Sequence, residues 1–182
     1  HSKADEQLQA NALVNWISDR RVKYPKMHVY HYNHTERSTL ASLVSTNQNN
    51  VGVQQLFDAL KEKNVFVDLF QIVKQTLQVG VESYGLKKIE KVAGYLRPTD
   101  DSVSGGADAV AAYEGWMRAS DKSLADQLLT EIRNYNEQDV LATKHVRDWL
   151  VSLRKQAGVR KWPKFDFDDQ LKPIDPVEQT LL

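Results

Sequence analysis

Three carboxylates stand where the local chain is expected to hold them in fixed positions. Glu36 and Asp68 each follow a short strand-like segment, and Asp139 lies within a helical one. In α/β folds, ligand sites gather at the ends of strands, because the sheet fixes the side chains while the loops leave room for a substrate. Tyr135 and Asp139 are four residues apart, so on a helix they share one face and can serve one site.

An oxygen-rich set of this kind suits hard divalent cations. Mg²⁺ prefers oxygen ligands, and a pair of ions bridged by three or four carboxylates activates a water molecule and stabilises the leaving group of a phosphodiester. Carboxylates without cysteine or basic partners therefore indicate metal chemistry before acid–base catalysis. A tyrosine one turn before a carboxylate is suited to orient the attacking water through its hydroxyl.

Hydrophobic periodicity predicts that most of the chain is helical. Apolar residues recur at the helix period in seven segments, over residues 4–23, 35–44, 53–60, 69–77, 86–92, 110–117 and 123–154. Two short runs, residues 27–32 and 65–67, are instead typical of strands. Two short strands are hard to stabilise alone, so the first strands of the sheet are expected to lie before His1, in a longer protein of which this chain is a fragment.

The predicted domain organisation is one domain and a tail. A chain of 182 residues with 41% apolar content can bury one core. We expect the domain over residues 1–155 and an extended or surface-wrapping tail over residues 156–182, which holds Pro163, Pro173 and Pro176. Residues 97–106 carry dense turn chemistry and predict a loop.

Composition restricts the other function classes only in part. Lys plus Arg and Asp plus Glu both number 24, so a nucleic-acid substrate would need a local basic patch. The absence of cysteine excludes disulfides, cysteine–zinc sites and thiol nucleophiles. No segment is apolar enough to span a membrane or to serve as a signal peptide, and a cytoplasmic protein is expected.

Four segments together resemble a known family. They are HVYHYNHTERSTL (28–40), FVDLFQIVK (66–74), SYGLKKIE (83–90) and YNEQDVLAT (135–143). In this order they are similar to the RecB-like nuclease family, whose ribonuclease-H-like domain belongs to the DEDD exonuclease superfamily. The resemblance implies an α/β, helix-rich, ribonuclease-H-like fold in which Glu36 is the second acid, Tyr135 the tyrosine and Asp139 the third acid of the tyrosine subclass.

The resemblance also implies an activity. It is 3′–5′ exonucleolytic hydrolysis of DNA or RNA, with single strands as substrate and two Mg²⁺ or Mn²⁺ ions. Glu36 and Asp139 would bind metal with Asp68 as a secondary candidate, Tyr135 would position the water, and Asn33 or Asn136 would support the site. Helicase or other nuclease modules of DNA repair are the implied partners.

Two departures from the family pattern stand out. The second motif has Glu36 where the wider superfamily mostly has Asp, and the sequence has no Asp-x-Glu, since Asp5 and Glu6 are adjacent on a predicted helix. The isolated chain is therefore expected to bind metal weakly and to cleave poorly. The alternative function is a catalytically incomplete nucleic-acid-binding or protein-interaction domain on the same scaffold.

Each candidate residue also has a plain structural interpretation. Glu36 is a favourable first-turn acid, and Asp68 is a candidate N-cap for the helix after it. The spacing of His28, His31 and His34 throws neighbours onto opposite faces of a strand and disfavours a histidine metal site. A solvated helix face is the favoured interpretation of two basic groups, with phosphate contact as the alternative; they are Lys87, Lys88 and Lys91, and Arg154, Lys155, Arg160, Lys161 and Lys164.

Overall fold

The computed structural model describes residues 3–45, 51–98 and 105–159. Most of the predicted loop at 97–106 and of the predicted tail, with Arg160, Lys161 and Lys164, lies outside these residues. The chain divides into two compact units, His1–Leu150 and Val151–Leu182. All elements below belong to the first unit except the last residues of the final helix.

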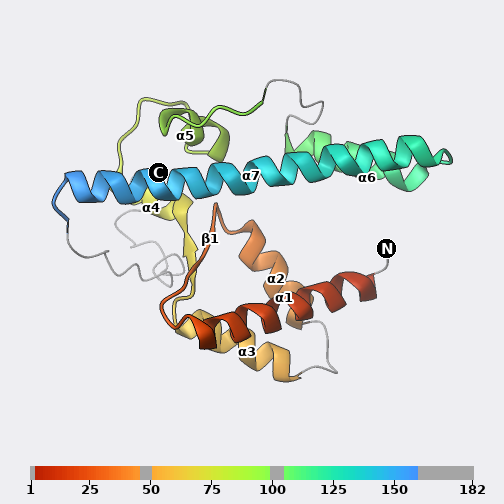
Figure 1. Ribbon diagram of the computed structural model, residues 1–182, viewed down its shortest axis with the longest axis horizontal. Coiled ribbons are helices and arrows are strands. Elements are labelled where there is room, and N and C mark those ends of the chain that lie inside the picture. The colour runs from red at the N-terminus through yellow and green to blue at the C-terminus, as the bar shows by residue number, and fades with distance from the viewer. Residues whose placement is uncertain (1–2, 46–50, 99–104, 160–182) are drawn as a thin grey trace, which may run out of the picture. The chain divides into compact units, whose positions relative to one another are not determined.

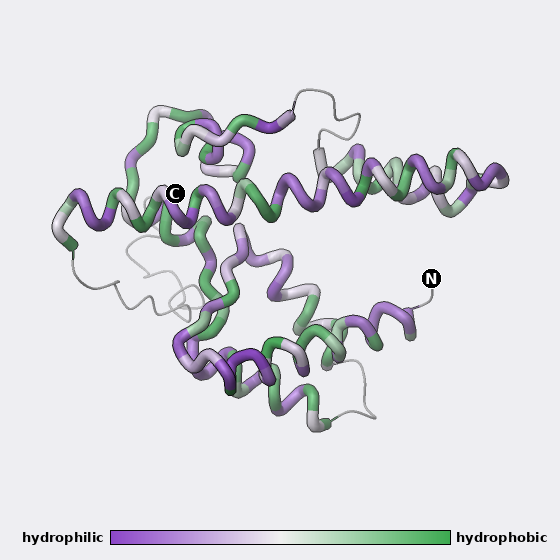
Figure 2. The backbone as a smooth tube through the Cα atoms, in the orientation of Figure 1, coloured by the Kyte–Doolittle hydropathy of each residue, from purple (hydrophilic) through white to green (hydrophobic). Residues whose placement is uncertain are grey.

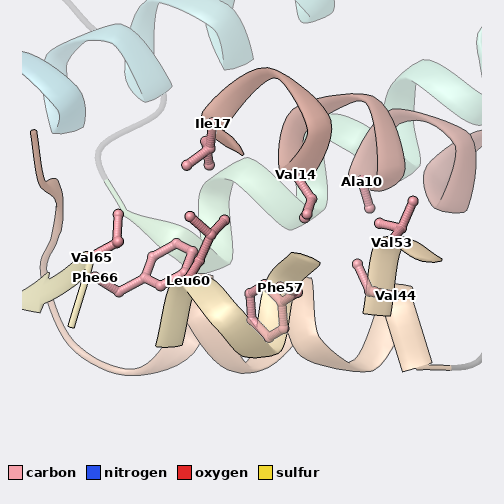
Figure 3. Packing of buried hydrophobic residues seen from close by; sticks show 9 residues of the cluster. All are labelled: Ala10, Val14, Ile17, Val44, Val53, Phe57, Leu60, Val65 and Phe66. Atoms are coloured by element: carbon pink, nitrogen blue, oxygen red, sulfur yellow. The ribbon is translucent and has the colours of Figure 1, made fainter. Parts of the chain in front are cut away.

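The first part of the unit is a three-helix cluster built on α1 (Lys3–Lys23), α2 (Thr35–Ser45) and α3 (Val51–Glu62). Its core residues come from these helices and from the segment after α3 (Figure 3), and they are Ala10, Val14, Ile17, Val44, Val53, Phe57, Leu60, Val65 and Phe66. Ala10, Val14 and Ile17 recur at the helix period, which places them on one face of α1. The amphipathic helix predicted for residues 4–23 is thereby confirmed.

Two strands of three residues each form a parallel pair, β1 (Val29–His31) and β2 (Phe66–Asp68), with α2 and α3 in the connection between them (Figure 1). The register aligns Val29 with Phe66 and His31 with Asp68. Both strands were predicted, although the first is shorter than expected and the second ends one residue later. Because the pair is parallel, the carboxyl ends of both strands lie at the same edge.

The remaining helices are α4 (Leu69–Thr76), α5 (Leu86–Val92), α6 (Gly106–Arg118) and α7 (Lys122–Gln156). Hydrophobic residues follow β2 into α4 (Figure 2), where Leu69, Ile72 and Val73 are buried. Gly115 of α6 lies close to α7, since a Cβ there would come within 3.4 Å of Leu128 Cδ1. All seven predicted helices are present among the described residues, within a few residues at each end.

The fold is helix-rich, with only a small parallel sheet in the described residues, as the predicted class requires. None of the helices in the described part of the chain has the length and apolar character needed to cross a membrane.

Candidate active site

Asp68 stands at the end of β2 and caps the helix that follows. Its Oδ1 accepts hydrogen bonds from the backbone N–H of Phe70 at 2.9 Å and of Gln71 at 3.4 Å. The same oxygen accepts from the backbone N–H of Asn33 at 3.0 Å, which ties the ends of the two strands together. The Asp68 side chain is buried, and its observed contacts are those of an N-cap.

Asn33 shapes the turn between β1 and α2. Its φ of 76° is in the left-handed region, which Asn tolerates better than most residues. Its Oδ1 accepts from the backbone N–H of His34 at 2.8 Å, and its carbonyl accepts from Nδ1 of the buried His31. The predicted supporting residue Asn33 thus lies beside Asp68 and organises a turn.

Glu36 lies in the first turn of α2 and is exposed. It makes no hydrogen bond or ion pair with any other residue that the structure describes. The favourable interaction of a first-turn acid with the helix dipole accounts for its position. The structure does not bring Glu36 together with Asp139.

Tyr135 and Asp139 do come together on one face of α7, as their spacing predicts. The pKa of the Tyr135 hydroxyl is raised by burial first, and then by the charge of the Asp139 carboxylate and a hydrogen bond to it. A raised pKa keeps this phenol protonated at neutral pH. Asn136, the other predicted supporting residue, is exposed on the same helix.

An arginine from the segment after α5 joins this pair. Nη2 of Arg97 lies 2.6 Å from Asp139 Oδ1, and the same nitrogen lies 2.7 Å from Glu90 Oε2. Nε of Arg97 donates to Glu90 Oε1 at 2.7 Å. Glu90 is 2% exposed, whereas 33% of the Asp139 side chain is exposed. One guanidinium therefore links a buried carboxylate to the half-exposed carboxylate of the predicted site.

The turn after α5 brings Arg97 back to Glu90. Gly94 adopts a φ of 87°, and the N–H of Tyr95 donates to the Glu90 carbonyl at 2.8 Å, which is a Schellman end to the helix. The returning segment is held against α7 by a hydrogen bond from the Tyr95 hydroxyl to Gln138 Oε1 at 2.7 Å. His145 of α7 adds a 2.9 Å hydrogen bond from Nε2 to the Ala93 carbonyl.

Sequence reasoning missed Glu90 and Arg97 as members of the site. A signal was present, because Leu86, Ile89 and Glu90 share one helix face at spacings of three and four. A carboxylate on an apolar face predicts a buried cationic partner. Arg97 is the first arginine after it.

A family model described as the RNase H superfamily matches residues 1–151. The chain belongs to the RNase H superfamily. No curated protein and no solved structure gives a significant match. Membership confirms the predicted fold class and indicates a nuclease-type function on nucleic acid.

RNase H superfamily folds generally use divalent metal ions. The question is whether the acidic side chains of this chain are arranged to bind such an ion. No group of three or more His, Cys, Asp or Glu side chains is arranged to hold a metal within the described residues. Both oxygens of Glu90 and Oδ1 of Asp139 contact Arg97, and Oδ1 of Asp68 caps α4. The described residues of this RNase H superfamily chain therefore do not by themselves fit a divalent metal site.

Proposed function

We propose that this chain contributes Tyr135 and Asp139 to a nuclease domain of the 3′–5′ exonuclease type, similar to the tyrosine subclass of RecB-like DEDD enzymes. The reaction is hydrolysis of a phosphodiester bond in DNA or RNA. The single observation that carries the proposal is the placement of Tyr135 and Asp139 one turn apart on α7, where Arg97 lies against both, within a chain that belongs to a nuclease superfamily.

In this proposal Tyr135 acts as a neutral hydrogen-bonding group. A tyrosine hydroxyl is protonated at neutral pH at its ordinary pKa of about 10, and the pKa of Tyr135 is raised further, so the residue orients a water molecule and does not act as a base. The Asp139 carboxylate, one turn further along the same helix, would accept a hydrogen bond from that hydroxyl and so fix its direction. The other acids of a complete Mg²⁺ or Mn²⁺ site are not assembled among the described residues, and Glu36 enters the proposal only through the family resemblance.

The second candidate function is a nucleic-acid-binding or protein-interaction domain without catalysis. Two observations favour it: the sequence has no Asp-x-Glu, and Arg97 already compensates the charge of Asp139. The helicase or nuclease partners implied by the resemblance, and a cytoplasmic location, belong equally to both candidates.

A nuclease assay on the full chain distinguishes the two functions. Single-stranded DNA and RNA with labels at the 3′ or 5′ end are incubated with Mn²⁺ or with EDTA. The variants are Asp139→Asn and, as a matched control, Asp126→Asn, which alters an exposed aspartate on the same helix. Because the described residues do not assemble a complete metal site, the nuclease proposal expects only slow release of end label, which depends on Mn²⁺ and is lost in Asp139→Asn but not in Asp126→Asn.

Two other outcomes have different meanings. Equal cleavage by both variants would remove Asp139 from the site. Binding of the oligonucleotides by the wild-type chain without cleavage under any condition would leave the non-catalytic function standing.

A further inference from the structure

Three lysines of α5 differ in their surroundings, although the sequence presents them as one basic cluster. Nζ of Lys88 pairs with Glu82 Oε2 at 2.9 Å, and Lys91 is exposed in the last turn. Lys87 is half-buried, and its Nζ lies 5.2 Å from the ring centroid of Tyr135 on α7. Lys87 is therefore the member of this cluster that reaches the candidate active site.

Two cations lie against the Tyr135 ring, and their charges are compensated differently. The guanidinium carbon of Arg97 is 5.9 Å from the ring centroid, and its charge is balanced by hydrogen bonds to Glu90 and Asp139. Lys87 makes no ion pair with any carboxylate of the described residues. The electron-rich face of the tyrosine stabilises an ammonium group but does not neutralise it. The positive charge of Lys87 therefore remains available to bind an anion.

From this difference we propose that Lys87 binds a phosphate of the nucleic-acid strand beside Tyr135 and Asp139. The inference rests on the proposed function, since the phosphate in question lies next to the group that orients water. An ammonium group offers a point charge and three donors, which suits a phosphate oxygen without fixing base identity. Arg97, whose Nε and Nη2 already bind the carboxylates of Glu90 and Asp139, has instead a structural role.

The chain as a whole has no net charge, so its affinity for nucleic acid depends on where individual cations such as Lys87 lie. With 24 basic and 24 acidic residues there is no global field to attract nucleic acid, so affinity must come from particular cations. Each phosphate contact on a single strand adds about 0.7 to the slope of log affinity against log salt. A lost contact at Lys87 is therefore visible in the salt dependence as well as in the affinity.

The test is binding without turnover. Fluorescence anisotropy of a labelled single-stranded DNA and a labelled single-stranded RNA is measured with the full chain in EDTA over a range of salt concentrations. The variants are Lys87→Gln and Lys87→Arg, with Lys88→Gln and Lys91→Gln as controls from the same helix. Circular dichroism melting of each variant reports whether the fold is kept.

The expected result is specific to Lys87. Lys87→Gln lowers affinity by roughly threefold or more and reduces the salt slope by about 0.7, while both control variants bind nearly as the wild type does. Lys87→Arg keeps the slope, because the charge is retained. Lys87→Gln binding with the affinity and slope of Lys91→Gln would overturn the inference and leave the proposed function intact. Failure of the wild-type chain to bind either oligonucleotide would instead overturn the proposed function.

Discussion

Arg97 binds both carboxylate oxygens of Glu90, with Nε and Nη2 each 2.7 Å from its partner oxygen. The hydrogen bonds to Glu90 are the main reason that the pKa of Arg97 is raised above its ordinary value. Glu90 is 2% exposed and the Arg97 side chain 17%, so neither charge is well solvated. Planar two-point pairing of this kind fixes direction as well as distance, and Nη2 of Arg97 is thereby aimed at Asp139.

Removal of Glu90 is expected to destabilise the chain strongly. Glu90→Ala leaves the Arg97 guanidinium without its main partner in a poorly solvated place, and a loss of about 3 kcal/mol in the free energy of unfolding is expected. The matched control is Glu82→Ala, because Glu82 is exposed and pairs with Lys88; its loss should stay within about 1 kcal/mol. Urea unfolding of both variants measures the difference. Equal losses would show that the Glu90 pair does not organise the segment after α5.

The cap at Asp68 gives a second stability prediction. Asp68→Ala removes the acceptor for the N–H groups of Phe70, Gln71 and Asn33, and a loss of about 2 kcal/mol is expected. Asp121 caps the start of α7 in an exposed position, so Asp121→Ala should lose only about 1 kcal/mol.

Asp68→Asn tests whether the residue also has a chemical role. Its side-chain carbonyl can still accept these bonds, so stability should fall less than in Asp68→Ala, and cleavage, where the wild-type chain shows it, should persist. Loss of cleavage in Asp68→Asn at unchanged stability would support the role of Asp68 as a metal ligand.

Alkaline pH should weaken the fold through Tyr32. Burial, and then the charge of Asp68, raise the pKa of this tyrosine above its ordinary value of 10.0. Above that value the unfolded chain releases the proton while the folded chain keeps it, so the free energy of unfolding falls as pH rises, by up to about 1.4 kcal/mol per pH unit. The contribution of Tyr32 is fully present below pH 10.

Urea unfolding of Tyr32→Phe between pH 8 and 11 checks this mechanism. At pH 8 the variant should be less stable by about 1 kcal/mol, because the hydrogen bond from the Tyr32 hydroxyl to the Tyr84 carbonyl is lost. Its decline above pH 10 should be shallower than in the wild type. Tyr24→Phe, at an exposed position, should keep the wild-type slope. An unchanged slope in Tyr32→Phe would assign the decline to other groups.

Contacts between residues close together in the sequence were predictable, and contacts between residues far apart in the sequence were not. Tyr135 and Asp139 are joined by one helical turn, so spacing alone placed them together, and the N-cap alternative for Asp68 followed from the first turn of the next helix. The contact between Arg97 and Asp139 spans 42 residues. It depends on the turn at Gly94 and on the hydrogen bonds from α7 to Ala93 and Tyr95, neither of which a local pattern encodes. The position of Lys87 over Tyr135 is likewise a contact between residues far apart in the chain, which is why its cluster looked like an ordinary solvated face.

Mn²⁺ is expected to stabilise the chain very little. Asp139 forms an ion pair with Arg97, and no group of three acidic side chains is arranged to bind a metal in the described residues. If the dissociation constant lies above about 10 mM, Mn²⁺ at about 1 mM adds less than about 0.1 kcal/mol to the free energy of unfolding, and the melting temperature should not move measurably. Thermal melts of the wild type and Asp139→Asn with Mn²⁺ or EDTA test this.

A rise of several degrees in the melting temperature of the wild type that disappears in Asp139→Asn would contradict the prediction. It would mean that Mn²⁺ displaces Arg97 from Asp139 and that the acidic side chains gather around the ion. Such a result would favour catalysis by this chain over the binding function.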